Sequence, residues 1–192
     1  LQVPVFIDKL FKPTLALLVL SKMGEKELGI YSMSIMLQGF LLVFSRSLNQ
    51  IYTTKLLLNY GSHDNLKKTF KYIIKPTIYI VLAGVIITIL FTLMIEPLIF
   101  SLIPKYNEVI QPVKILSISL IISTLGFPLA LFTSGLLYTQ RIVTRLVKVL
   151  ITLGIIIYLD NTVTNLAISM IAGEFASMFL GQILLFNKLR NA

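Results

Sequence analysis

Long apolar runs separated by short polar segments dominate the chain. About six of them approach the roughly 20 residues that an α-helix needs to cross a bilayer. They cover residues 3–20, 28–57, 72–95, 109–138, 142–159 and 163–186. The pattern therefore predicts an all-α, polytopic transmembrane bundle of about six helices, forming a single domain over 1–192.

Two interruptions predict local geometry within this bundle. Gly126 and Pro128 fall inside the fourth run, and a proline there removes a backbone hydrogen bond and clashes with the preceding turn. We therefore expect a kink in the fourth helix. Only Asp160, Asn161 and Thr162 separate the fifth run from the sixth, which predicts a tight hairpin.

A polar stretch at about 59–71 separates the second run from the third. The spacing of Leu66, Phe70 and Ile73 predicts an amphipathic helix lying on the cytoplasmic membrane surface. The chain's single histidine, His63, falls here. One histidine without a second ligand or a nucleophile is typical of a solvated loop.

Composition supports a membrane protein. Hydrophobic residues make up 56% of the 192 residues, charged residues 13%, and mean hydropathy is +0.89. Soluble domains carry about 25% charged residues. The net charge of +9 could indicate nucleic-acid binding, but the basic residues cluster between apolar runs, which favours loops facing anionic lipid.

Basic residues also predict the orientation. A cytoplasmic N-terminus leaves Arg46 within a span and places only Lys22, Lys26, Lys105 and Lys114 outside. The segments then inside hold Lys9, Lys12, Lys55, Lys67, Lys68, Lys71, Lys75, Arg141, Arg145, Lys148, Lys188 and Arg190. This asymmetry predicts that both termini of the segment face the cytoplasm.

Signals for enzymatic chemistry are absent from the sequence. It contains no cysteine, and no metalloprotease, nucleophile-elbow, Walker or paired-carboxylate motif. We therefore expect a protein that is not an enzyme, with no cofactor and no metal site.

A polar stripe on the second predicted helix is the first candidate site. Gln38, Ser45, Arg46, Asn49 and Thr53 fall within about 100° of arc. A stripe with one charge is costly against lipid, so it predicts a polar interior that binds substrate. The alternative is that Arg46 snorkels to the cytoplasmic headgroups.

Charged residues open the first predicted helix. Asp8, Lys9 and Lys12 form either an interfacial anchor or a cation cluster at a cytoplasmic gate that attracts an anion. Asp8 and Lys12 are also spaced for an i,i+4 ion pair.

Glu174 is the carboxylate placed deepest in a predicted span. Ser177 and Gly181 share its face, with Gly173 nearby, and small residues permit close helix packing. Packing does not account for Glu174, which needs a Lys or Arg of a neighbouring helix, or a proton. It is thus a candidate for ion coupling or for a buried pair, as is Asp8.

Several short motifs carry a family resemblance. They are Phe6-Ile7-Asp8-Lys9, the segment from Gly24 to Ser32, Pro97-Leu98-Ile99 with Pro104-Lys105-Tyr106, and Gly135-Leu136-Leu137-Tyr138. Together they resemble the polysaccharide-export flippases, which share a superfamily with the lipid II flippases and the MATE multidrug exporters.

The resemblance implies one half of a two-bundle, alternating-access transporter of the bacterial cytoplasmic membrane. Since the chain starts at Leu1 rather than Met, we expect the C-terminal half, whose partner is a second bundle outside this chain. The implied cargo is an undecaprenyl-diphosphate-linked oligosaccharide. Arg46 is then the cation within the cavity, with Lys9 and Lys12 at its cytoplasmic mouth.

Two other functions stay open. A cation-coupled drug exporter of the same superfamily would use membrane carboxylates, for which only Glu174 and Asp8 are available. A membrane scaffold or assembly subunit that transports nothing is equally compatible with the pattern. A membrane-embedded enzyme is the weakest alternative, because no acid–base or metal constellation is present.

Overall fold

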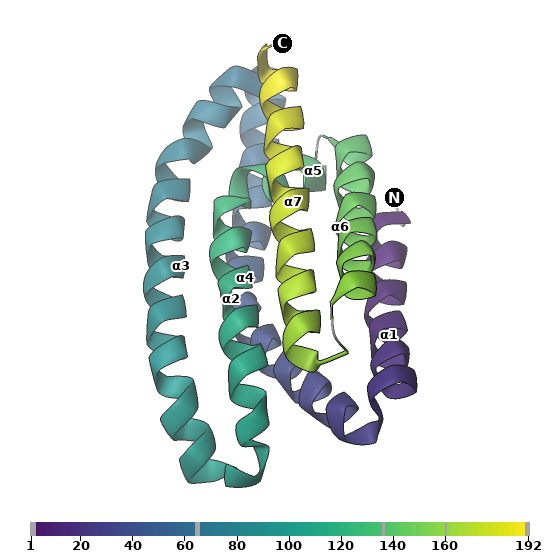
Figure 1. Cartoon of the computed structure of the whole chain (residues 1–192). Coiled ribbons are helices and arrows are strands. Elements are labelled where there is room, and N and C mark those ends of the chain that lie inside the picture. Colours follow the sequence, from purple (N-terminus) through teal and green to yellow (C-terminus); the bar gives the residue numbers. More distant parts are fainter. Residues whose placement is uncertain (1–2, 64–65, 136, 160, 191–192) are drawn as a thin grey trace.

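A computed structural model describes residues 3–63, 66–135, 137–159 and 161–190, and these parts are almost entirely helical. The helices are α1 (Val3–Met23), α2 (Glu25–His63), α3 (Leu66–Leu102), the 3-10 helix η1 (Pro104–Val109), α4 (Ile110–Leu125), α5 (Phe127–Gly135), α6 (Tyr138–Tyr158) and α7 (Val163–Arg190). The predicted all-α bundle is confirmed (Figure 1).

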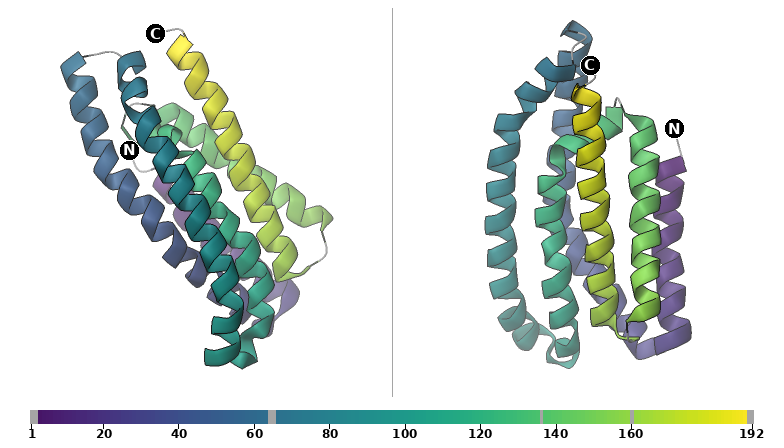
Figure 2. Two further views of the ribbon diagram at one scale, coloured as in Figure 1. Left: turned by 90° about the vertical axis from the view of Figure 1, so that its left-hand side faces the viewer. Right: turned by 45° about the horizontal axis from the view of Figure 1, so that its top comes forward.

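The long helices lie side by side, and both ends of the described chain lie toward the upper end of the bundle in Figure 1. The α1–α2 and α6–α7 turns lie at the opposite end, and the further views agree (Figure 2). Among the described residues, four helical segments are long and apolar enough to cross a membrane: Glu25–Leu58, Lys67–Leu102, Pro104–Leu125 and Val163–Arg190.

Two of the six predicted spans, α1 and α6, fall outside those four. Each has 21 residues, or about 31 Å of helix, which matches the hydrocarbon thickness. Each also carries three charged residues close together: Asp8, Lys9 and Lys12 on α1, and Arg141, Arg145 and Lys148 on α6. Their charge, and not their length, sets them apart.

The fourth predicted span is divided in two, as the Gly126–Pro128 pattern predicts. Gly126 has φ −77° and ψ 2°, outside the helical region, and separates α4 from α5. Its N–H still bonds to the carbonyl of Ile122 at 2.8 Å. Pro128 has no N–H to offer the carbonyl of Thr124, so the helix cannot continue unbroken.

The structure differs from the prediction of a separate surface helix at 59–71. α2 continues to His63 and α3 already begins at Leu66, while residues 64 and 65 lie outside the described part. Phe70 packs against the rings of Phe132 on α5 and Phe186 on α7, and Ile73 is buried. Phe70 and Ile73, two of the three residues with this spacing, therefore pack inside the protein.

Two tight turns bring neighbouring helices together. Gly24 adopts φ 92°, a left-handed conformation that glycine takes without steric cost, and its N–H bonds to the carbonyls of Val19 and Leu20. At the predicted α6–α7 hairpin, the Thr162 hydroxyl accepts the Asn165 N–H at 3.2 Å and caps α7. Asp160 of that hairpin lies outside the described residues.

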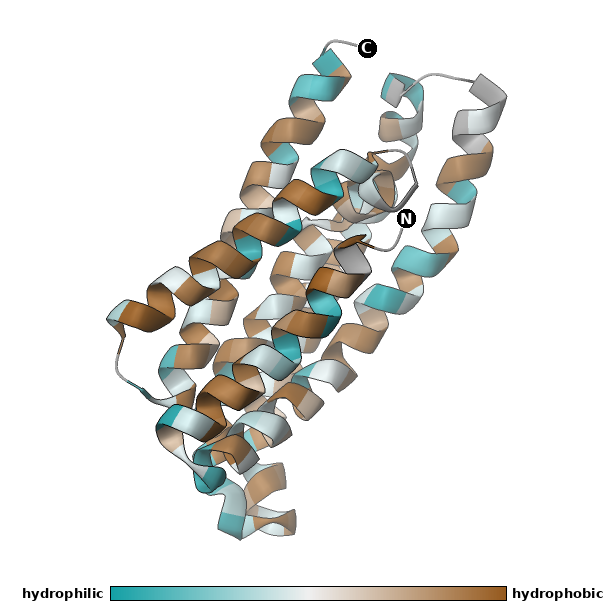
Figure 3. Ribbon diagram, turned by 90° about the vertical axis from the view of Figure 1, so that its right-hand side faces the viewer, coloured by the Kyte–Doolittle hydropathy of each residue, from teal (hydrophilic) through white to brown (hydrophobic). Residues whose placement is uncertain are grey.

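The interior has an apolar cluster toward each end and polar side chains between them. Leu15, Val113 and Leu166 belong to the cluster nearest the α1–α2 and α6–α7 turns, and Leu56 and Phe132 to the other. Many large apolar side chains are exposed, as expected for contact with lipid, and hydrophobic residues recur along all the long helices (Figure 3). A polar layer within such a bundle is where a functional site is expected.

Candidate functional site

An ion pair joins α6 to α7 within this polar layer. Lys148 Nζ donates a 2.8 Å hydrogen bond to Glu174 Oε1, and the two side chains are only 15% and 18% exposed. Glu174 therefore has the cationic partner from a neighbouring helix that its depth predicts. The helices approach closely at Gly173, where an added Cβ would lie 2.8 Å from the Lys148 carbonyl oxygen.

A second ion pair joins α1 to α6. Arg145 Nη1 lies 3.3 Å from Asp8 Oδ1, and both side chains are more exposed than the first pair. The sequence left open an intrahelical pair between Asp8 and Lys12. Within the described residues, the carboxylate instead pairs across helices with Arg145.

Lys12 connects the two pairs. Its ammonium group lies within range of charge–charge interaction with four groups: Asp8, Arg46, Lys148 and Glu174. We call Asp8, Lys12, Arg46, Arg145, Lys148 and Glu174 the charged cluster. It draws on α1, α2, α6 and α7 and holds four cations against two carboxylates, so it carries a surplus of positive charge.

The predicted polar stripe on α2 divides between two environments. Gln38 is 5% exposed and donates from Nε2 to Ser119 Oγ on α4 at 2.9 Å, and Ser45 bonds to Ser123 on α4. Asn49 is partly buried, and its Oδ1 has no hydrogen-bond partner in the described chain. Gln38 and Ser45 thus join α2 to α4, and the role of Gln38 in a substrate cavity stays a prediction.

The two remaining predicted cations are both exposed. Arg46 lies at the edge of the stripe and forms no ion pair within the described ranges, although it belongs to the charged cluster through Lys12. Lys9 is exposed on α1 and likewise has no carboxylate partner in the part that the structure describes. Arg46 therefore joins Lys12 in the charged cluster, whereas Lys9 is an exposed residue of α1.

Arg145 and Lys148 are site residues that the sequence indicated only as basic residues near a helix end. Their spacing in the sequence indicates that they share one face of a helix. Arg141, Arg145 and Lys148 recur at intervals of four and three residues, so they share one face of α6. Because α6 contacts α1 in the structure, this basic face brings Arg145 to Asp8.

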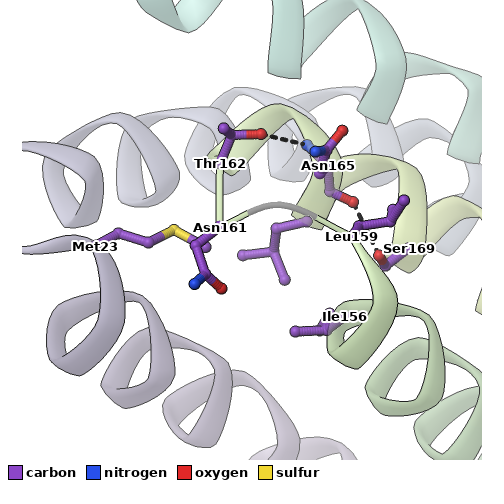
Figure 4. A pocket seen from close by; sticks show the side chains of 8 residues that line it. Met23, Ile156, Leu159, Asn161, Thr162, Asn165 and Ser169 are labelled. Atoms are coloured by element: carbon purple, nitrogen blue, oxygen red, sulfur yellow. Dashed lines mark hydrogen bonds between the residues drawn. The ribbon is translucent and has the colours of Figure 1, made fainter.

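A small hollow of about 10 Å³ lies at the opposite end of the bundle, beside the α6–α7 turn (Figure 4). Met23 of α1 closes one side of it, and Asn165 and Ser169 of α7 line another. Its size is close to that of one water molecule, so it takes no larger ligand. The described residues contain no group of three or more His, Asp or Glu side chains suited to a metal ion.

Comparison with protein families, characterised proteins and solved structures gives no match for this chain. The charged cluster is accordingly interpreted from its own chemistry.

Proposed function

We propose that this chain is one bundle of a membrane transporter that flips a lipid-linked oligosaccharide, carried on undecaprenyl diphosphate, across the bacterial cytoplasmic membrane. The observation that supports the proposal best is that Lys12 lies within range of charge–charge interaction with Arg46 on α2 and Lys148 on α6. The motifs similar to polysaccharide-export flippases agree with it.

A diphosphate needs such a site because an unpaired charge is strongly disfavoured in hydrocarbon. In the charged cluster, Asp8 and Glu174 are paired with Arg145 and Lys148. Lys12 and Arg46 form no ion pair within the described chain. These two cations match the two negative charges of a diphosphate, which favours an anionic cargo over cation-coupled drug export.

Exposure of Lys12 and Arg46 supports a two-bundle arrangement. Both side chains are open to the outside of this chain, so a second bundle facing α1 and α2 would close the site. Val43, an exposed apolar side chain one turn from Arg46 on α2, would pack in that contact. Rocking of one bundle against the other would then give alternating access to the site from each leaflet.

The orientation belongs to the same proposal. The basic ends of α3, α6 and α7 would face the cytoplasm, where anionic lipid attracts Lys and Arg. The charged cluster would then receive its cargo from the cytoplasmic leaflet.

A flipping assay on the intact transporter tests the proposal. The protein is reconstituted into liposomes with a fluorescent undecaprenyl-diphosphate oligosaccharide, and transfer between leaflets is timed. We expect the double variant Lys12→Gln/Arg46→Gln to flip the lipid at least about tenfold more slowly, equivalent to about 1.4 kcal/mol. Lys105→Gln, which removes an exposed cation at the opposite end, is the matched control and leaves the rate unchanged.

Other outcomes would select another function. Failure of the reconstituted wild-type protein to move this lipid would overturn the proposal in favour of a scaffold. Drug transport that depends on Glu174 and ignores Lys12 and Arg46 would favour the exporter.

A further inference from the structure

A groove of about 380 Å³ runs between α2 and α3, which lie side by side (Figure 2). Its lining residues follow the helical repeat: Phe44 and Tyr52 lie two turns apart on α2, and Lys75, Tyr79 and Ala83 lie one turn apart on α3. The volume falls in the range of about 300–1,000 Å³ typical of ligand sites.

Polarity changes along the length of this groove. α2 and α3 are antiparallel, so Phe44 and Ala83 lie at one end, which is apolar. Tyr52 and Lys75 lie at the other end, which is nearer the basic ends of the helices. A second cation stands there too, because Lys55 Nζ lies 5.5 Å from the centre of the Tyr52 ring.

This groove is separate from the charged cluster. At 100° per residue, Arg46 lies about 200° around α2 from Phe44, so it points to the other side of the helix. A ligand of the groove is therefore distinct from the proposed cargo, and its binding does not depend on transport.

We infer that the α2–α3 groove binds an anionic glycerophospholipid from the surrounding membrane. One acyl chain lies along Phe44, Ile80 and Ala83, and the phosphate lies near Lys55 and Lys75. The charge gradient argues for this occupant, since a hydrocarbon chain with a negative headgroup matches both ends of the groove. The tyrosine rings of Tyr52 and Tyr79 stand between these ends and suit the headgroup boundary.

Native mass spectrometry of the intact protein tests this site. The protein is incubated with equal amounts of phosphatidylglycerol and phosphatidylcholine that have the same acyl chains. We expect preferential retention of phosphatidylglycerol, and Lys75→Gln and Lys55→Gln each to weaken it by about fivefold. Lys188→Gln removes an exposed cation at the same end of the bundle, outside the groove, and leaves retention unchanged.

A second variant tests the apolar end. Ala83→Leu adds a side chain where the acyl chain would lie, so we expect it to reduce retention of both lipids, with helicity unchanged by circular dichroism. Equal retention of the two lipids by the wild-type protein would overturn the inference. So would the same loss in Lys188→Gln as in Lys75→Gln, because the cations would then act only through general surface charge.

Discussion

Lys148 and Glu174 form an ion pair where α6 and α7 approach each other closely. The 2.8 Å bond lies beside Gly173, whose missing side chain allows the Lys148 backbone to come near. The ion pair and the close packing therefore lie at the same place in the α6–α7 interface, and both stabilise it. Removing either partner leaves an uncompensated charge in a protected place.

The first prediction concerns this pair. Glu174→Gln leaves Lys148 without its counter-charge, and we expect the free energy of unfolding to fall by about 3 kcal/mol. The double variant Lys148→Gln/Glu174→Gln should recover most of that loss. Thermal unfolding in nanodiscs measures both. Glu108→Gln, which breaks the exposed pair with Lys26, is the control and should leave the melting temperature unchanged.

The second prediction concerns the close approach at Gly173. A Cβ there would lie 2.2 Å from Thr152 Oγ1, so Gly173→Ala forces α6 and α7 apart and should cost about 2 kcal/mol. Gly154→Ala is the control, because a Cβ at that position of α6 meets nothing within 4 Å. It should stabilise the protein by up to about 1 kcal/mol. Equal effects of the two variants on thermal unfolding would contradict the packing argument.

A third prediction separates packing from cargo binding on α2. Gln38→Leu breaks the buried bond to Ser119, and a double-mutant cycle of the two positions should give a coupling of about 0.6–1.7 kcal/mol. Transport should be unaffected by Gln38→Leu at a temperature well below unfolding. Gln50→Leu, exposed on the same helix, should change neither quantity. Loss of transport in Gln38→Leu but not in Gln50→Leu would show that Gln38 contributes to cargo binding.

The fourth prediction concerns the α1–α2 turn. Gly24→Ala places a side chain on a left-handed residue, which should cost about 1–2 kcal/mol. Gly29→Ala is the matched control, since Gly29 lies within α2 and a Cβ there meets nothing within 4 Å. Urea unfolding of both variants provides the comparison. A stability loss that is equal for the two glycines would show that the turn does not depend on Gly24.

Much of the fold followed from hydrophobic periodicity. The apolar runs marked the long helices, and Gly126 with Pro128 marked the break between α4 and α5, because both features act locally along the chain. The described residues of the segment 59–71 belong to the ends of α2 and α3 and not to a separate surface helix. Its apolar spacing looks the same whether Phe70 faces lipid or packs on Phe132.

The charged cluster was only partly predictable. The sequence predicts that Glu174 needs a cationic partner. That this partner is Lys148 depends on the relative rotation of α6 and α7. The pairing of Asp8 with Arg145 instead of Lys12 depends likewise on the placement of α1 beside α6. Such contacts are separated by many residues, so no local pattern specifies them.

The hairpin of α6 and α7 has a consequence for how the protein enters the membrane. The translocon releases a single helix into lipid according to its own composition, and each centrally placed Arg or Lys raises that cost by about 2.5–3.5 kcal/mol. α6 alone carries Arg141, Arg145 and Lys148. Glu174 neutralises Lys148 only once α7 has been synthesised. The carboxylate that lowers the cost of placing Lys148 in lipid thus comes from the helix that follows it, so we expect α6 and α7 to enter the membrane as a pair.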